Sequence, residues 1–279
     1  YIERLFGIPL LKALVLAMSP KLEMGVSYLV VIFSWGIPII ASVFYGTIEK
    51  RLNRLWPPTQ EETLAKIKFI HDHASDSPDP ALIMVEKELM RLVRRLPIYM
   101  KGVVANVEET FAGKNDSFEV APYHIAFENI SKEIGYTLSD ISQQSMNEET
   151  STKLLWLLNV QDLLVALEKN LVSFAELACE PGYSQRLRGF MEVIVQSQEF
   201  LLMQAVDAFT GDDREDVSIL RVMTSDSGDN LESVRKLYLE AEGGMEFKDK
   251  AQLHRLSGLY ERTAWLLNRL SVVVEAGDA

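Results

Sequence analysis

The stretch MGVSYLVVIFSWGIPIIASVFYGTI, residues 24–48, decides how this chain must be organised. It contains no Asp, Glu, Lys, Arg or His, although 24% of the 279 residues are charged. A bilayer core of ~30 Å needs about 20 helical residues to cross it, so the stretch predicts a membrane-spanning helix. A buried core helix of a soluble protein is the alternative interpretation.

Basic residues follow this stretch directly, at Lys50, Arg51 and Arg54. Clusters of basic residues at the end of a span mark the cytoplasmic side of a membrane. We therefore expect a protein of the cell inner (plasma) membrane, with the residues after about 49 in the cytoplasm and the lipid bilayer as its first partner.

A shorter apolar segment, GIPLLKALVLAM, lies within residues 1–18. Its length suits a truncated or re-entrant membrane segment, so residues 1–56 are predicted to form a membrane helix hairpin. The chain begins with Tyr1 and lacks a signal peptide pattern, which indicates a fragment of a longer protein; a naturally short protein is the alternative.

The net charge, the cysteine count and the absence of catalytic motifs argue against several classes of function for this chain. A net charge of −12 argues against nucleic acid and against broad docking on anionic lipid. The single cysteine, Cys179, permits no internal disulfide and lies in an apolar helical pattern, so we expect it to pack rather than react. The chain has no glycine-rich phosphate loop, nucleophile elbow or paired-histidine metal motif, and we expect neither an enzyme nor a bound cofactor.

The rest of the chain reads as helix, because apolar residues recur three and four apart and breaks coincide with Gly and Pro. Residues 57–79 are expected to form a polar connector. The expected helices cover residues 80–112, 121–144, 147–178, 185–209, 214–242 and 247–275, and the inward positions of the first two are Leu82, Val85, Leu89, Leu92, Val93, Leu96, Ile125, Ile130, Ile134, Leu138 and Ile141. Two sets of three helices, residues 80–180 and 183–279, suggest an internal duplication that forms a pair of three-helix bundles in an all-α protein.

Several segments together resemble bacterial sodium/phosphate symporters that carry a PhoU-like helical domain after their membrane part. Residues 1–18 are similar to the family's penultimate membrane segment, Ser27–Pro58 to its last span, and Asp79–Leu96 to the first PhoU helix. Ser131–Leu138 resembles the second PhoU helix, and Met146–Glu149 resembles the loop into the third. The order of these segments, rather than any single motif, carries the resemblance.

Members of this family carry an acidic motif, Glu-Arg-x-x-Asp, on PhoU helices, where it gathers a cation. In this chain the two copies fall on Leu164 to Glu168 and on Glu261 to Trp265. Each copy keeps one acid of two, so the resemblance implies a degenerate site and no bound metal. Glu168 could still be a partial ligand with Asp162. The Glu261 and Arg262 pair is expected to be buried in a polar contact, and Trp265 is expected to be buried as well.

Two other charged clusters could bind a metal or a partner, or could simply be solvated surface residues. His71, Asp72, His73 and Asp76 could bind a metal, although alternating residues in a loop are more often solvated. The acidic and basic residues of the run 86–95 are spaced for surface pairs on a helix, and the basic members could also hold an acidic partner or lipid headgroups. These basic residues are Arg91, Arg94 and Arg95.

The resemblance implies the C-terminal portion of a sodium-coupled phosphate transporter, with a cytosolic PhoU-like domain that regulates or assembles it. Its partners would be the upstream membrane domain and, through that missing part only, sodium and phosphate; self-association stays open. The alternative is a membrane-anchored helical signalling or scaffold protein without transport activity.

Overall fold

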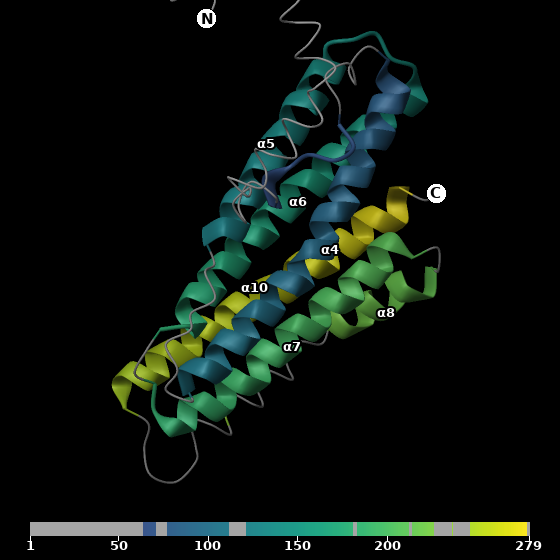
Figure 1. Ribbon diagram of the computed structural model, residues 1–279. Coiled ribbons are helices and arrows are strands. Elements are labelled where there is room, and N and C mark those ends of the chain that lie inside the picture. The colour runs from purple at the N-terminus through teal and green to yellow at the C-terminus, as the bar shows by residue number, and fades with distance from the viewer. Residues whose placement is uncertain are drawn as a thin grey trace, which may run out of the picture. The chain divides into compact units, whose positions relative to one another are not determined.

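The computed structural model describes residues 64–70, 77–111, 121–180, 183–211, 214–225 and 246–277, together with residue 236. Helices are the regular structure of these residues (Figure 1). The helices are α4 (Pro78–Phe111), α5 (Ala121–Ser142), α6 (Glu148–Ala178), α7 (Gln185–Thr210), α8 (Arg214–Ser225) and α10 (Phe247–Gly277). The chain divides into two units, Tyr1–Thr59 and Gln60–Ala279, and the first lies outside the described residues.

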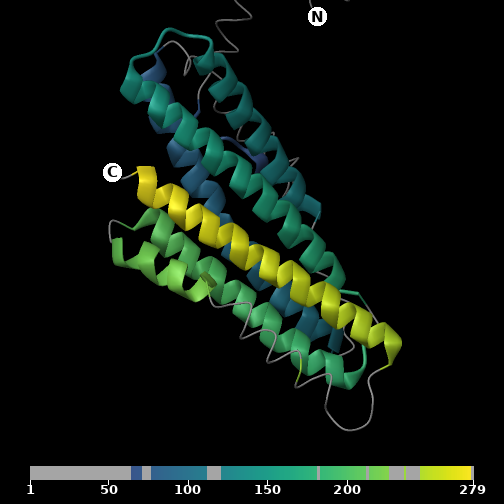
Figure 2. The ribbon, with the colours of Figure 1, turned by 180° about the vertical axis from the view of Figure 1, so that it is seen from behind.

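The described helices associate in two groups of three. Helices α4, α5 and α6 all contact one another, and so do α7, α8 and α10. The principal contacts between the groups join α4 to α7 and α6 to α10. Figure 2 shows α10 lying between α6 on one side and α7 with α8 on the other.

The helix boundaries agree closely with the sequence prediction, and the differences have local causes. Helix α4 begins at Pro78 rather than at residue 80, which takes two residues from the predicted connector. Proline suits the first turn of a helix, where its missing N–H has no partner to lose. Of the predicted helix over residues 214–242, the structure describes α8, which ends at Ser225, and residue 236, which is also helical.

None of the helices in the described part of the chain combines the length and apolar character that crossing a bilayer requires. The predicted hairpin, residues 1–56, and the run at residues 24–48 lie outside the described residues. The membrane span therefore stays a prediction.

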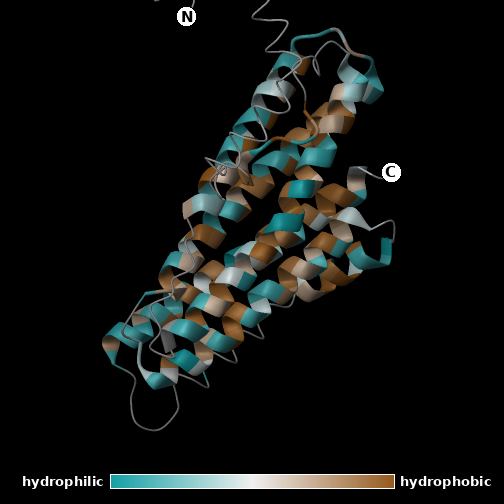
Figure 3. Ribbon diagram, viewed as in Figure 1, coloured by the Kyte–Doolittle hydropathy of each residue, from teal (hydrophilic) through white to brown (hydrophobic). Residues whose placement is uncertain are grey.

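The core forms where the apolar faces of the helices meet. All six inward positions predicted for α4 are buried, and Phe174 of α6 and Phe190 of α7 are the largest fully buried side chains. Figure 3 shows apolar and polar bands alternating along the helices, as expected when each helix turns one face inward. On α5 the prediction is right for Ile130, Ile134, Leu138 and Ile141. It is wrong for Ile125, which is 40% exposed because Ala126 and Phe127 take the inward direction at that turn.

A small polar network lies where α6, α7 and α10 meet. The Asn170 side chain donates from Nδ2 to the carbonyl oxygen of Leu259 and to Thr263 Oγ1, both at 2.8 Å. Gln198 Nε2 donates to the same hydroxyl at 2.6 Å. All three polar side chains are buried, so their hydrogen bonds replace part of the water that these groups give up on folding. Within the described residues, Asn170 Oδ1 and Gln198 Oε1 have no hydrogen-bond partner.

The start of α6 is fixed by Asn147, an N-cap at the first residue of the helix predicted over 147–178. Asn147 has extended backbone angles, and its side chain accepts a hydrogen bond from the Thr150 N–H at 2.7 Å. The Thr150 hydroxyl in turn donates to Asp79 at the start of α4, at 2.5 Å. The cap therefore also aligns the first turns of two helices.

Replacing Asn147 with alanine should lower the free energy of unfolding by about 1 kcal/mol, because the Thr150 N–H loses its acceptor. Asn147→Asp should retain most of the stability, since a carboxylate accepts the same bond. Urea denaturation followed by circular dichroism measures both variants, with the exposed Ser145→Ala as control. Equal stability of Asn147→Ala and Ser145→Ala would show that the cap contributes nothing.

Candidate functional site

Glu168 is the buried carboxylate around which the candidate site is built. It lies on α6 and is 7% exposed. Its Oε1 atom is 2.8 Å from Nδ1 of His124 on α5. Burial raises the pKa of Glu168, and the His124 hydrogen bond opposes that rise without cancelling it. The pair thus joins two helices through a carboxyl group that holds its proton more tightly than an exposed one would.

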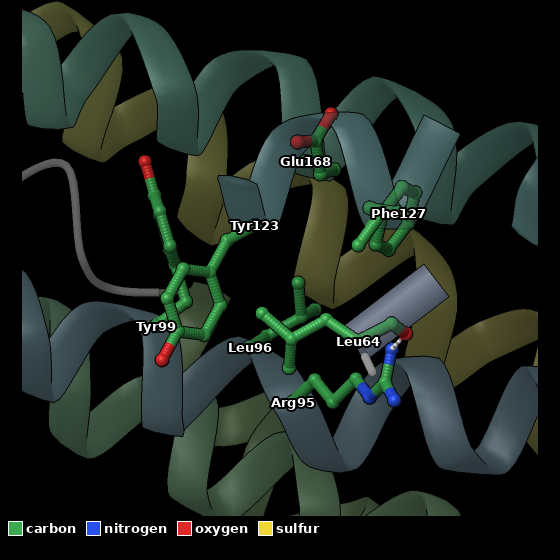
Figure 4. Close-up of a pocket in the computed structure, with 8 residues that line it drawn as sticks. Leu64, Arg95, Leu96, Tyr99, Tyr123, Phe127 and Glu168 are labelled. Atoms are coloured by element: carbon green, nitrogen blue, oxygen red, sulfur yellow. Dashed lines mark hydrogen bonds between the residues drawn. The ribbon is translucent and has the colours of Figure 1, made fainter. Parts of the chain in front are cut away.

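A small hollow lies on one side of Glu168, between α4 and α5. It has a volume of about 30 Å³, which is the space of roughly one water molecule. Figure 4 shows Tyr99 and Tyr123 on one side of it and Phe127 on the other, with Arg95 bonded to the carbonyl oxygen of Leu64. The two tyrosine rings are 6.0 Å apart and tilted. Burial raises the pKa of Tyr99, so its hydroxyl stays protonated at neutral pH.

A larger and more polar groove lies on the other side, between α5 and α6. Its volume is about 290 Å³, and its polar lining comes from His124, Glu128, Ser131, Lys132, Gln161, Glu168 and Lys169. At Gly135 a Cβ would lie 3.2 Å from Gln161 Nε2, the atom that donates to the Ser131 carbonyl oxygen at 2.8 Å. Glycine therefore leaves room for the bond that ties α5 to α6 beside this groove.

The degenerate motif positions do not come together in one site. Leu164 is part of the core, and Glu168 is directed to α5 rather than to α10. On α10, Glu261 is half-buried while Arg262 is exposed, so the prediction of a buried pair is wrong for Arg262. The expectation that Trp265 is buried is also wrong, since 63% of it is exposed.

The helix period explains the position of Trp265. Thr263, Ala264, Leu266 and Leu267 are the buried residues of this turn. At ~100° per residue, Trp265 points about 200° away from Thr263, and so toward solvent. The phase of α10 follows its small and aliphatic residues rather than its largest aromatic one.

The metal candidates can be placed only in part. His71, Asp72, His73 and Asp76 lie outside the described residues. Within the residues that the structure describes, no three His, Cys, Asp or Glu side chains gather closely enough to hold a metal ion. Asp162 is exposed on α6, whereas Glu168 is buried, so the two do not share an environment.

Cys179 is half-buried at the end of α6. Asn106 Nδ2 donates to its sulfur at 3.3 Å, and burial raises the pKa of the thiol to about 11. Because the thiolate is the nucleophilic form, this cysteine is unreactive at neutral pH.

Two features of this region were missed from the sequence. His124 and Glu168 are 44 positions apart, and nothing in their neighbourhoods predicts their contact. The network of Asn170, Gln198 and Thr263 did leave a signal, because each of these polar residues interrupts an apolar helix face.

Comparisons of the chain with protein-family models, with curated proteins and with solved structures found no match.

The raised pKa of Glu168 makes stability depend on pH. A glutamate whose pKa is higher in the folded state than in the unfolded state stabilises the fold in its protonated form. This contribution is fully present at pH values below the unfolded-state pKa of about 4.3, and it is lost as the pH rises through the folded-state pKa. Relative to Glu168→Gln, the wild-type chain should therefore lose stability across that window, by at most about 1.4 kcal/mol per pH unit.

Urea denaturation at a series of pH values measures this difference. The control is Glu176→Gln, an exposed glutamate on the same helix, whose difference from wild type should show no such fall. A wild-type chain that gains stability over Glu168→Gln as pH rises from 4 would contradict the direction of the shift.

Proposed function

We propose that this chain is the C-terminal portion of a sodium-coupled phosphate transporter, in which a membrane hairpin at residues 1–56 carries a PhoU-like helical domain on the cytoplasmic side. The helical domain regulates or assembles the transporter and carries out no chemistry of its own. Sodium and phosphate bind in the upstream membrane part, where a second repeat would complete the transport path.

The observation that supports this proposal best is the repeated contact pattern of the helices. Within each group of three, every helix contacts the other two. Between the groups, the first helices α4 and α7 meet, and the third helices α6 and α10 meet. Contacts between equivalent elements are expected when two copies of one unit pack about a two-fold axis. A duplicated three-helix unit is what the family resemblance implies for a PhoU-like domain.

The small hollow and the larger groove beside Glu168 fit a regulatory role better than a transport path. The hollow next to Tyr99 has room for about one water, and the groove next to Lys132 is lined by groups of both charges. The apolar run at residues 24–48 and the basic residues after it supply the membrane attachment in this proposal. The helical domain would then act on the membrane part through its surface or through the chain that joins them.

Uptake of labelled phosphate tests the proposal. The gene product that contains this chain is expressed in bacterial cells without their own phosphate uptake systems, and uptake is measured with sodium and with choline as the external cation. We expect uptake that requires sodium, and an altered dependence on internal phosphate when the helical domain is unfolded by a core substitution.

The matched control is the exposed Trp265→Ala variant, which should leave uptake unchanged. Membrane-inserted protein that gives equal uptake with sodium and with choline would overturn the proposal. That result would favour a membrane-anchored signalling or scaffold protein.

A further inference from the structure

Residues 64–70, hereafter the strap, lie against α4 and are held there through main-chain atoms. Arg95 Nη1 donates to the carbonyl oxygen of Leu64 at 2.5 Å, and Arg91 Nη2 donates to that of Lys66 at 3.0 Å. Glu88 Oε2 accepts from the backbone N–H groups of Lys68, at 3.4 Å, and of Phe69, at 3.1 Å. Four bonds thus tie this segment, which is helical at Leu64 and Ala65 and irregular from Lys66 on, to one side of α4.

Glu88, Arg91 and Arg95 are hereafter called the clasp. They are spaced three and four residues apart along α4, so their side chains share one face of the helix. Glu88 is fully buried and forms an ion pair with Arg91. The predicted spacing does pair Glu88 with Arg91, but the expectation of a solvated surface is wrong for Glu88, which is buried. Of the three arginines, Arg94 is exposed, while Arg91 and Arg95 are half-buried. A buried carboxylate is tolerated only when hydrogen bonds compensate for lost water. The strap supplies two of them.

The strap also provides hydrogen-bond acceptors for the two arginines of the clasp, Arg91 and Arg95. Burial, and then the nearby positive charge of Arg91, lowers the pKa of Arg95. The carbonyl oxygens of Leu64 and Lys66 place a partial negative charge against each guanidinium. All four hydrogen bonds between the clasp and the strap go to main-chain atoms of the strap, so none of them depends on which side chains the strap carries.

Apolar side chains of the strap also contact the helices. Ile67 and Ile70 are half-buried and pack against the core. A short segment that is not part of a long helix can open locally while the helices stay folded. Release of the strap would leave the helix-to-helix contacts of α4 with α5, α6 and α7 in place.

The first residue of the strap covers the hollow beside Glu168. Leu64 lines this hollow together with Arg95, Tyr99, Tyr123 and Glu168 (Figure 4). Arg95 belongs to both features, since it lines the hollow and binds the strap. Removing the strap would take away one wall of the hollow and free the Arg95 side chain.

We propose that residues 64–70 are a releasable strap that closes the hollow beside Glu168, and that the clasp of Glu88, Arg91 and Arg95 sets how tightly it is held. Because the strap continues directly from the chain before residue 64, a movement of that preceding chain would open or close the hollow. The device works whatever the membrane part transports, so it does not rest on the proposed function.

The test uses Glu88→Ala in the full chain, with Glu86→Ala as the matched control. Glu86 is a partly exposed acid on the same helix, and it pairs with Lys153 of α6. In Glu88→Ala, the amide hydrogens of Lys68 and Phe69 should exchange about 10- to 150-fold faster, the range expected when a hydrogen bond to a charged group is lost. Trypsin cleavage after Lys66 and Lys68 should accelerate by a similar factor. Glu86→Ala should match wild type in both measurements.

A second pair of variants keeps the test decisive if Glu88→Ala does not fold. Ile67→Ser and Ile70→Ser weaken the strap itself and leave the helices intact. Hydroxyl-radical labelling of Tyr99 and Tyr123, read by mass spectrometry, then reports whether the hollow has opened. We expect labelling to rise together with strap exchange. Unchanged exchange in Glu88→Ala would show that the clasp does not hold the strap. Faster exchange in any of the three variants without increased labelling would show that the strap does not close the hollow.

Discussion

Replacing Phe174 with alanine should lower the free energy of unfolding by about 3 to 5 kcal/mol, the largest effect expected of any substitution considered for this chain. Phe174 lies on α6 and is fully buried, within the core shared by the two helix groups. Truncation removes the transfer free energy of the ring and leaves a cavity that the surrounding helices can fill only in part. Domains are stable by only about 5 to 15 kcal/mol, so this single change removes a large share of the total.

The matched control is Trp265→Ala, which deletes a larger aromatic side chain from an exposed position. We expect a change within about 0.5 kcal/mol, since surface substitutions seldom exceed that. For a domain of this size, thermal unfolding should show a fall in Tm of roughly 6 to 20 °C for Phe174→Ala. Comparable losses for the two variants would contradict the assignment of inward and outward faces on α6 and α10.

Replacing Thr263 with valine should cost about 1 to 3 kcal/mol, because the shape is retained while the hydroxyl is lost. Thr263 Oγ1 accepts from Gln198 Nε2 and Asn170 Nδ2, and it donates to the Leu259 carbonyl oxygen at 3.2 Å. Asn170 keeps its bond to that carbonyl oxygen, but the bond from Gln198 has no replacement in the network. A buried donor left without a partner costs its full desolvation penalty.

The control is Thr152→Val, whose hydroxyl bonds only to its own helix at an exposed position of α6. We expect little change there, since threonine and valine have similar helix propensities. In a double-mutant cycle, Thr263→Val with Gln198→Met should cost less than the two single changes added together, because neither partner is then orphaned. Additive losses measured by urea denaturation would show that the hydroxyl and the amide are not coupled.

Much of the helical arrangement could be predicted from local pattern. The inward face of α4 follows from apolar residues three and four apart, and Leu82, Leu89 and Leu96 are buried as that spacing requires. The start of α6 was readable because an N-cap depends on a few adjacent residues, here Asn147 and Thr150. Both features depend on short-range geometry that every helix shares.

The interior polar contacts could not be predicted in the same way. Glu88 and Arg91 have the spacing of an ordinary surface pair, and only the strap that covers them makes the pair part of the interior. The pairing of His124 with Glu168 depends on how α5 and α6 are rotated against each other. Trp265 was misplaced because its size suggested burial, while the phase of α10 is set by its smaller neighbours. For Glu88 and for His124 with Glu168, the deciding contact lies far away in sequence.

The proposed function requires a membrane hairpin at residues 1–56 that carries the helical domain on the cytoplasmic side. Reporter fusions after Ala279, made in a bacterial host, distinguish the two sides of the membrane. We expect a fused fluorescent protein, which matures in the cytoplasm, to be bright in the membrane fraction, and a fused alkaline phosphatase, which needs the periplasm, to be inactive. An active phosphatase fusion, or a fluorescent fusion recovered entirely from the soluble fraction, would contradict the claim.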